Sequence, residues 1–259
     1  MELTGYIASA FIGISLGLIG GGGSVLTVPI LVYLFHIEPV LATAYSLFIV
    51  GTTSAAGAWQ KWHKREINFR VALIFGIPSL LTVFLFRKSV VPLIPEIIYQ
   101  NSSLTIYKGM LTLLLFALLM IFAAIAMLRP KEMKRPILPG NTGLLALGII
   151  VGVISGLLGA GGGFIIIPAL IFYASLDIRT AIGTSLLIIA INSLVGFTGD
   201  LSHHPIDWAI LLSISGLGVI GIFIGHWLSR KIPADGIKKI FGWFILVMGI
   251  FILAKELLF

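Results

Sequence analysis

Long apolar blocks constrain this chain more than any other feature of its sequence. Of its residues, 58% are hydrophobic and 10% are charged, whereas soluble domains carry about 25% charged residues. A water-soluble core has no room for so much apolar surface, so the composition predicts an integral membrane protein. Eight blocks can be delimited: 3–36, 39–60, 68–86, 104–128, 143–174, 177–198, 206–228 and 237–258.

Glycine runs interrupt the first and the fifth of these blocks, both of which are too long for a single membrane span of about 20 residues. The runs are Gly20–Gly23 in the first block, and Gly159 with Gly161–Gly163 in the fifth. A glycine in a helix interior destabilises the helix by roughly 1 kcal/mol relative to alanine. Each long block is therefore predicted to be two helices joined by a break, with the second helix beginning at Ser24 or at Gly163.

The two runs belong to an internal duplication of the chain. When residues 13–69 are placed on residues 152–208 without a gap, 15 of the 57 positions are identical. The identical pairs include Gly13/Gly152, Gly17/Gly156, Gly20/Gly159, Gly22/Gly161, Gly23/Gly162, Pro29/Pro168, Ser46/Ser185, Ser54/Ser193 and Gly57/Gly196. Apolar matches arise easily by chance, but an ordered series of Gly, Pro and Ser matches does not. The sequence predicts two membrane repeats, 1–128 and 143–259, joined by a basic cytoplasmic linker over 129–142.

The charges of the loops indicate that the repeats are inverted relative to each other. If all eight blocks crossed the membrane once, the 17 Lys and Arg residues would divide 9 to 8 between the two sides. If each glycine-broken block instead enters and leaves on the same side, the division becomes 13 to 4, which matches the excess of basic residues in cytoplasmic loops. The basic loops 61–70 and 129–135 are then cytoplasmic, in a multi-pass protein of the cell membrane. A re-entrant hairpin and a pair of tilted full crossings give the same sidedness, so both interpretations stand at this point.

Helix breaks at equivalent places in two inverted repeats are the best pointer in a sequence to a transporter binding site. Irregular backbone is tolerated at membrane depth only where it is buried in protein or lines a wet cavity. A helix N-terminus has free N–H groups and a partial positive charge, so it favours anions, and glycine lets an oxyanion approach the backbone closely. We therefore expect the two runs, with Ser24, to bind a small anionic substrate. The backbone candidates are Gly20, Gly21, Gly22, Gly23, Gly159, Gly161, Gly162 and Gly163.

Small polar side chains follow each run, on one face of the next apolar block. The positions i, i+7 and i+11 share a helical face, and they are Ser46, Thr53 and Gly57 in the first repeat and Ser185, Asn192 and Gly196 in the second. Their donors could bind an oxyanion, or they could form interhelical hydrogen bonds worth about 0.6 kcal/mol each. The candidates for substrate binding are Tyr45, Ser46, Thr184, Ser185 and Asn192. Because Tyr45 aligns with Thr184, the two half-sites are not equivalent.

Other glycines have the spacing of close helix packing rather than of a binding site. Small residues repeated every fourth position let two membrane helices approach closely. The sets with this spacing are Gly13/Gly17, Gly148/Gly152/Gly156 and Gly221/Gly225. We expect them at helix–helix contacts.

Several functional classes lack support. The net charge of +7 comes from basic residues in short loops between apolar blocks, so nucleic acid is not an expected partner. The segment Gly20–Ser24 lacks the Lys of a phosphate-binding loop, so the chain is not expected to be an enzyme. No acidic residue lies deep in an apolar block, and His226 is expected at the membrane interface. Because His63, His203 and His204 have no carboxylate or thiol pattern beside them, no metal or other cofactor is expected.

In these motifs the chain resembles the sulfite exporter TauE/SafE family of membrane permeases. The resemblance is carried by GLIGGGGSVLTVP at 17–29 and GLLGAGGGFIIIP at 156–168, each followed by a Ser-Leu segment, ATAYSL at 42–47 and AIGTSL at 181–186. It covers essentially the whole chain. It implies transport, often export, of small sulfur-containing anions such as sulfite, thiosulfate or organosulfonates.

Together these features predict an all-α polytopic membrane protein of two inverted repeats, each with a Gly-broken helical hairpin and three transmembrane helices. The expected function is that of a secondary transporter, an exporter of small sulfur-containing anions. It would work by alternating access, with the repeats rocking around a midplane anion site at the two breaks. The alternatives are an uncoupled anion channel or facilitator, and an intramembrane enzyme or assembly factor. Nothing in the sequence indicates the oligomeric state.

Overall fold

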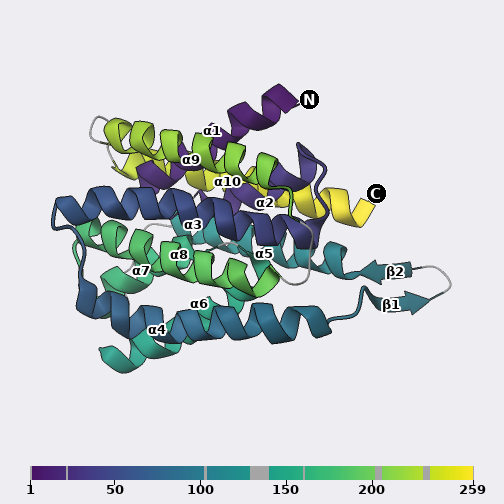
Figure 1. Cartoon of the computed structure of the whole chain (residues 1–259), viewed down its shortest axis with the longest axis horizontal. Helices are drawn as coiled ribbons and strands as arrows, with labels where there is room; N and C mark the ends of the chain where they lie inside the picture. The colour runs from purple at the N-terminus through teal and green to yellow at the C-terminus, as the bar shows by residue number, and fades with distance from the viewer. Residues whose placement is uncertain are drawn as a thin grey trace.

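Long helices lie side by side along one direction, and a two-stranded hairpin projects beyond one end of the bundle (Figure 1). This computed structural model describes residues 2–21, 23–101, 104–128, 140–159, 161–201, 206–229 and 234–258. Its helices are α1 (Glu2–Ile19), α2 (Ser24–Tyr33), α3 (Pro39–His63), α4 (Phe69–Leu85), α5 (Lys108–Leu128), α6 (Asn141–Leu158), α7 (Gly163–Ala174), α8 (Ile178–Asp200), α9 (Trp208–Leu228) and α10 (Ala234–Leu258). Within the described ranges, six helices are long and apolar enough to cross a membrane, namely α3, α4 with its continuation to Leu93, α5, α6, α8 and α9. The predicted all-α polytopic class is confirmed.

The fourth helix of each half of the chain, α4 or α9, packs against helices of the other half. Helix α9 packs along α1 and against α3, while α4 packs along α6 and against α8. Two bodies result: the α9 body contains α1, α2, α3 and α9, and the α4 body contains α6, α7, α8 and α4. They meet where α3 packs on α8, and the last helices of the two halves, α5 and α10, pack against each other.

Glycines let the exchanged helices approach at backbone distance. The backbone of Gly13 in α1 contacts the carbonyl of Gly218 in α9, and a methyl group on Gly152 in α6 would lie 2.7 Å from the carbonyl oxygen of Ser79 in α4. Gly13 and Gly152 are repeat equivalents, and Ser79 and Gly218 are separated by the same 139 positions. The predicted packing role of these glycines is confirmed. The offset of the duplication also extends beyond the compared positions, into α4 and α9.

The glycine run of each long block lies at the tip of a helical hairpin. At the open end of the first hairpin, the ring of Tyr6 near the start of α1 packs edge-on against Phe35, just beyond α2, with the centroids 5.5 Å apart. The chain therefore enters and leaves at the same end of the bundle. A re-entrant hairpin and a pair of tilted full crossings share this geometry, and the 10 residues of α2, about 15 Å of helix, favour the re-entrant hairpin.

The two hairpins enter from opposite ends of the bundle. Helix α3 follows the first hairpin and α8 follows the second, and these two helices run antiparallel. Phe48 in the first half of α3 packs on Phe197 near the end of α8, while Gly57 near the end of α3 lies beside Leu186 near the start of α8. Because the starts of α3 and α8 lie at opposite ends, the open ends of the hairpins do too.

A short β-hairpin precedes α5 and shortens the helix in the block 104–128. Strand β1 (Ile97–Asn101) pairs antiparallel with β2 (Leu104–Tyr107), and α5 begins only at Lys108. Ile94 has the extended backbone that a following proline, here Pro95, imposes on its predecessor. The β-branched and aromatic residues that follow favour strands. The structure thus adds a small sheet that the apolar pattern alone does not indicate.

Candidate functional site

Both interrupted helices end on a glycine with left-handed backbone. Gly20 follows α1 with φ +78°, and Gly159 follows α6 with φ +67°. Their N–H groups donate to the carbonyl oxygens of Leu16 (2.7 Å) and Ser155 (2.9 Å), which closes the last turn of each helix. Other residues adopt this backbone at a cost of roughly 1–2 kcal/mol. The predicted breaks are confirmed, and α2 and α7 begin at the predicted residues.

The two breaks meet in the interior of the bundle, backbone against backbone. A methyl group on Gly21 would lie 2.5 Å from the carbonyl oxygen of Gly163, and one on Gly163 would lie 2.6 Å from the Cα of Gly21. Gly161 and Gly162 complete the second tip, with φ angles of +63° and +69°. Gly22, the remaining candidate of the first run, lies outside the described residues. We call the contact of Gly21 with Gly163 the glycine junction.

The helices that start at the glycine junction have no side-chain caps. The N-cap residues of α2 and α7 are Gly23 and Gly162, which have no side chain that could accept from the first N–H groups. The positive ends of two helix dipoles, without a capping side chain, therefore lie at the junction. In α8, by contrast, hydrogen bonds from Thr180 hold the pKa of the capping Asp177 below its usual range. The side chains that cap α3, α4, α8 and α9 are Glu38, Asn68, Asp177 and Asp207.

Several buried hydroxyl groups have no hydrogen-bond partner among the described residues. The Oγ of Ser193 is one of them, and it lies beside the second break, 3.2 Å from the position that a methyl group on Gly161 would occupy. Ser54, its repeat equivalent in α3, and Ser46 are also fully buried and unpaired. An unsatisfied buried hydroxyl costs about 1–3 kcal/mol, so such groups mark places where a ligand or water can bind. Ser54 and Ser193 extend the set of candidates that the sequence predicts.

Two of the three predicted polar ligands of α8, Ser185 and Asn192, have partners within the protein. Ser185 donates from Oγ to the carbonyl oxygens of Gly20 (3.1 Å) and Ile182 (2.8 Å), so it connects the tip of the first hairpin to α8. The Nδ2 of Asn192 donates to Ser79 Oγ in α4 (2.7 Å), while its Oδ1 has no partner within the described ranges. Ser185 therefore lies at the break, and Asn192 links two helices of the α4 body.

Tyr45 and Thr184 occupy equivalent positions and make equivalent hydrogen bonds. The hydroxyl of Tyr45 accepts from the backbone N–H of Asp207 (2.6 Å), and Thr184 Oγ1 accepts from the backbone N–H of Asn68 (2.9 Å). Asp207 and Asn68 are the N-cap residues of α9 and α4. Each hydroxyl thus holds the start of the exchanged helix in its body. The two side chains differ in size but have the same partner in the fold.

Sequence reasoning missed a buried ion pair at the end of α4. Arg87 is fully buried, and its Nη1 donates to Asp200 Oδ2 at the end of α8 (3.1 Å) and to Thr43 Oγ1 in α3 (3.0 Å). Asp200 is only 5% exposed, so a buried acid is present just beyond the apolar block where none was expected. In the sequence both charges look like loop residues. The available signal in the sequence was the duplication, because its offset of 139 positions aligns Arg87 with His226 and Lys61 with Asp200, so ionisable residues recur at equivalent places.

The equivalent positions at the opposite end of the bundle also have ionisable side chains. The Nε2 of His226 lies 2.5 Å from Lys64 Nζ, in the loop between α3 and α4. Lys61, which is the repeat equivalent of Asp200, is paired with Glu66 at 2.6 Å. Basic and acidic groups therefore flank the glycine junction from both ends of the bundle.

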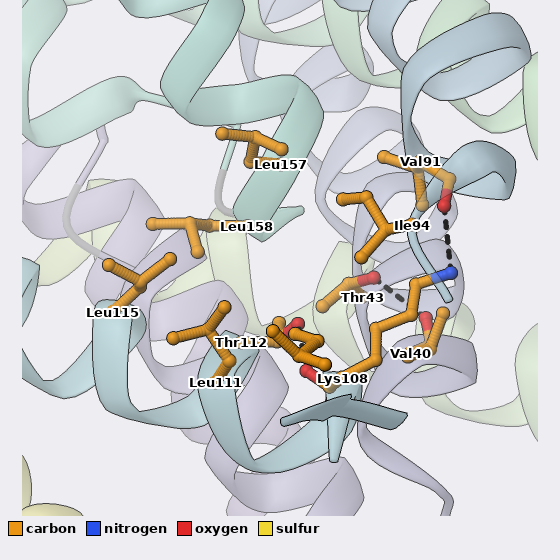
Figure 2. A pocket seen from close by; sticks show the side chains of 11 residues that line it. Val40, Thr43, Val91, Ile94, Lys108, Leu111, Thr112, Leu115, Leu157 and Leu158 are labelled. Atoms are coloured by element: carbon orange, nitrogen blue, oxygen red, sulfur yellow. Dashed lines mark hydrogen bonds between the residues drawn. The ribbon is translucent and has the colours of Figure 1, made fainter. Parts of the chain in front are cut away.

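A small cavity of about 50 Å³ adjoins the ion pair (Figure 2). Thr43 connects the two, since it lines the cavity and accepts from Arg87. Lys108, which is 7% exposed, also lines the cavity and donates to the carbonyl oxygen of Val91 (2.7 Å). Leu158, the residue before the break at the end of α6, forms another part of the wall. A second buried cation is thus close to the second glycine break.

Some predicted features lie outside the described residues. They include the basic linker over 129–139 and the pair His203–His204. In the part of the chain that the structure describes, no group of three or more His, Cys, Asp or Glu side chains is placed to hold a metal ion.

The chain is similar to known membrane proteins along almost all of its length. The family model described as "Sulfite exporter TauE/SafE" matches residues 6–252, which include both hairpins and the Arg87–Asp200 pair. A "Probable membrane transporter protein" of Xylella fastidiosa (strain 9a5c) is 30% identical over 258 residues, covering 96% of this chain and 94% of the relative. "Probable membrane transporter protein YdhB" of Bacillus subtilis (strain 168) is 27% identical over 228 residues, covering 88% and 90%.

Proposed function

Because the chain belongs to the sulfite exporter TauE/SafE family of membrane transporters, we propose that it is a secondary transporter of small sulfur-containing anions. Sulfite, thiosulfate and organosulfonates are the candidate substrates, with export as the direction. The substrate site in this proposal is the glycine junction, with Ser46, Ser54 and Ser193 as side-chain donors. Ser185 joins them once its hydrogen bond to Gly20 is released.

The meeting of two uncapped helix N-termini in an apolar interior carries this proposal. Each N-terminus is equivalent to roughly half a positive charge, and its first N–H groups need acceptors. A small oxyanion has several acceptor oxygens and one or two negative charges, so it satisfies both needs at once. The unpaired hydroxyl of Ser193 beside Gly161 supplies a further donor. A site of this kind needs no lysine or arginine at its centre.

Binding at the glycine junction requires a change of conformation. Gly21 and Gly163 touch through their backbones, so no anion fits between them in this arrangement. The two tips belong to different bodies, and a movement of the α9 body relative to the α4 body separates them. Such a movement opens the junction towards one end of the bundle at a time, which is the requirement for alternating access.

The end of α3 with Lys61, and the following loop with Lys64 and Arg65, are assigned to the cytoplasmic side in this proposal. Basic residues are enriched in cytoplasmic loops of membrane proteins. Arg179, which begins α8 at the same end of the bundle, falls on the same side. The first hairpin then opens to the outside and the second to the cytoplasm.

Flux into proteoliposomes tests the proposal. The purified protein is reconstituted, and uptake of ³⁵S-labelled sulfite and thiosulfate is measured with and without a pH gradient. Saturable uptake with counterflow supports a transporter, and a response to the gradient adds proton coupling. Uptake that neither saturates nor shows counterflow indicates the alternative, an uncoupled facilitator. Correctly folded protein without flux of any sulfur anion overturns the proposal.

A further inference from the structure

Arg87 has an unused hydrogen-bonding edge in the interior of the protein. Its side chain is fully buried, and Nη1 alone makes the contacts with Asp200 and Thr43. Its Nε and Nη2 have no hydrogen-bond partner in the described chain. On a planar guanidinium these two nitrogens point parallel N–H groups in one direction, which matches two oxygens of one oxyanion. A buried charged donor edge without an acceptor is costly, and a bound anion removes that cost.

Positive charge predominates around this edge. Arg87 and Lys108 are both buried, and Thr43 accepts from Arg87 and lines the same cavity as Lys108, whereas Asp200 is the acid paired with Arg87. Lys108 donates to a backbone carbonyl and forms no ion pair with a described residue. Glu38, at the start of α3, is exposed and caps its own helix. The buried groups therefore carry one positive charge in excess, which favours an anion.

The ion pair is connected to the second glycine break. A methyl group on Gly159 would lie 2.7 Å from Thr43 Cβ, so Thr43 contacts the break on one side and Arg87 on the other. Thr43 belongs to the α9 body and Arg87 to the α4 body. Their hydrogen bond therefore crosses between the bodies that must move apart at the glycine junction.

From this geometry we propose that Arg87 binds the transported anion through Nε and Nη2, at a station between the junction and the end of the bundle where α3 begins. The ligand class is a small oxyanion with at least two oxygens on one atom, and this assignment rests on the proposed function. Asp200 fixes Nη1 and competes with the anion for the charge of Arg87. Thr43 connects Arg87 to the second break, because it accepts from Arg87 and packs against Gly159.

Binding of ³⁵S-thiosulfate to the purified full-length protein in detergent tests the station without requiring transport. Arg87→Lys keeps the charge but loses the parallel donor edge, so we expect affinity to fall by at least about tenfold. Asp200→Asn removes the competing carboxylate, so affinity should rise severalfold. Lys88→Gln is the matched control, because Lys88 is the adjacent basic residue, is exposed and lies over the ring of Phe84. This control should leave affinity unchanged.

The opposite signs expected for Arg87→Lys and Asp200→Asn separate an anion site from a purely structural ion pair. Loss of affinity in both variants, or unchanged affinity in Arg87→Lys, overturns the inference, as does a wild-type protein that binds no thiosulfate. If Arg87→Lys does not fold, the sign for Asp200→Asn decides alone. Binding that follows the expected pattern without flux in proteoliposomes overturns the transporter proposal and leaves the Arg87 station in place. Saturable flux with unchanged affinity in both variants supports the transporter proposal and overturns the Arg87 station.

Discussion

Replacing Gly163 by alanine tests the glycine junction through the sign of a stability change. Gly163 is the first residue of α7, and alanine is favoured over glycine in a helix by up to about 1 kcal/mol. At this position, however, the added methyl group would lie 2.6 Å from the Cα and the carbonyl oxygen of Gly21, and 2.7 Å from Ile189 Cδ1. The backbone segments at Gly21 and Gly163 would have to move apart to make room for the methyl group. Overpacking of this kind costs typically 1–3 kcal/mol, so the net change is a destabilisation of up to about 2 kcal/mol.

Gly216→Ala provides the matched control for this prediction. Gly216 lies within α9, faces outward, and has nothing within 4 Å of the position of an added methyl group. The same chemical change there gains helix propensity without a clash, so a stabilisation of up to about 1 kcal/mol is expected. The difference between the two variants should therefore be about 1–3 kcal/mol, since the propensity gain largely cancels.

Equilibrium unfolding in mild detergent measures this difference. The five tryptophans of the chain give an intrinsic fluorescence signal, and a titration with a denaturing detergent gives the free energy of unfolding of each variant. Anion affinity is measured on the same samples. If Gly163→Ala is stabilised as much as Gly216→Ala, the tips of the hairpins do not touch, and the reasoning about the glycine junction is refuted.

Three further predictions address the donors, the exchanged helices and the orientation. Ser193→Ala removes an unpaired hydroxyl, so stability should stay the same or rise by up to about 1 kcal/mol while anion affinity falls by about 2- to 10-fold; a loss of stability with unchanged affinity would count against the substrate role. Tyr45→Phe and Thr184→Val each remove one hydrogen bond to an N-cap residue, so each should lower the free energy of unfolding by about 0.5–1.5 kcal/mol without changing affinity, as measured by unfolding and binding. Single cysteines in place of Lys64 and Arg179, in a chain that has no other cysteine, should react with a membrane-impermeant thiol reagent only from the cytoplasmic side; labelling of the two from different sides would restore parallel repeats.

Features that depend on local sequence could be predicted. The breaks after Ile19 and Leu158 follow from glycine, because other residues resist the left-handed backbone at Gly20 and Gly159. The starts of α2 and α7 follow from the end of each run. The packing of α1 on α9 is signalled by Gly13 through its spacing, although the spacing does not identify the partner helix.

Features that depend on distant partners could not be predicted. Arg87 follows an apolar block and Asp200 lies 113 positions away, so no local pattern distinguishes a buried ion pair from two loop charges. The comparison of Tyr45 with Thr184 suggested unequal half-sites. Both residues in fact hold the start of an exchanged helix, and a phenol and a small hydroxyl reach equivalent N–H groups from equivalent positions. Equivalent positions in a duplicated fold can therefore make the same hydrogen bond with side chains of different size, when the position of the partner backbone differs between the two copies.

The exchange of α4 and α9 changes which parts of the chain can move as rigid units. At Gly13, α1 packs on α9 at backbone distance, and at Gly152, α6 packs on α4 in the same way. Helices packed this closely cannot shift along each other without steric clashes. A motion that preserves them moves α1 to α3 with α9, and α6 to α8 with α4, rather than one half of the sequence against the other. The contacts of Gly21 with Gly163, Ser185 with Gly20 and Arg87 with Thr43 all lie between these two bodies. Each of the three involves a group suited to an oxyanion, so in the proposed mechanism an arriving anion would replace the contacts that hold the bodies together, and binding and opening would be parts of one event.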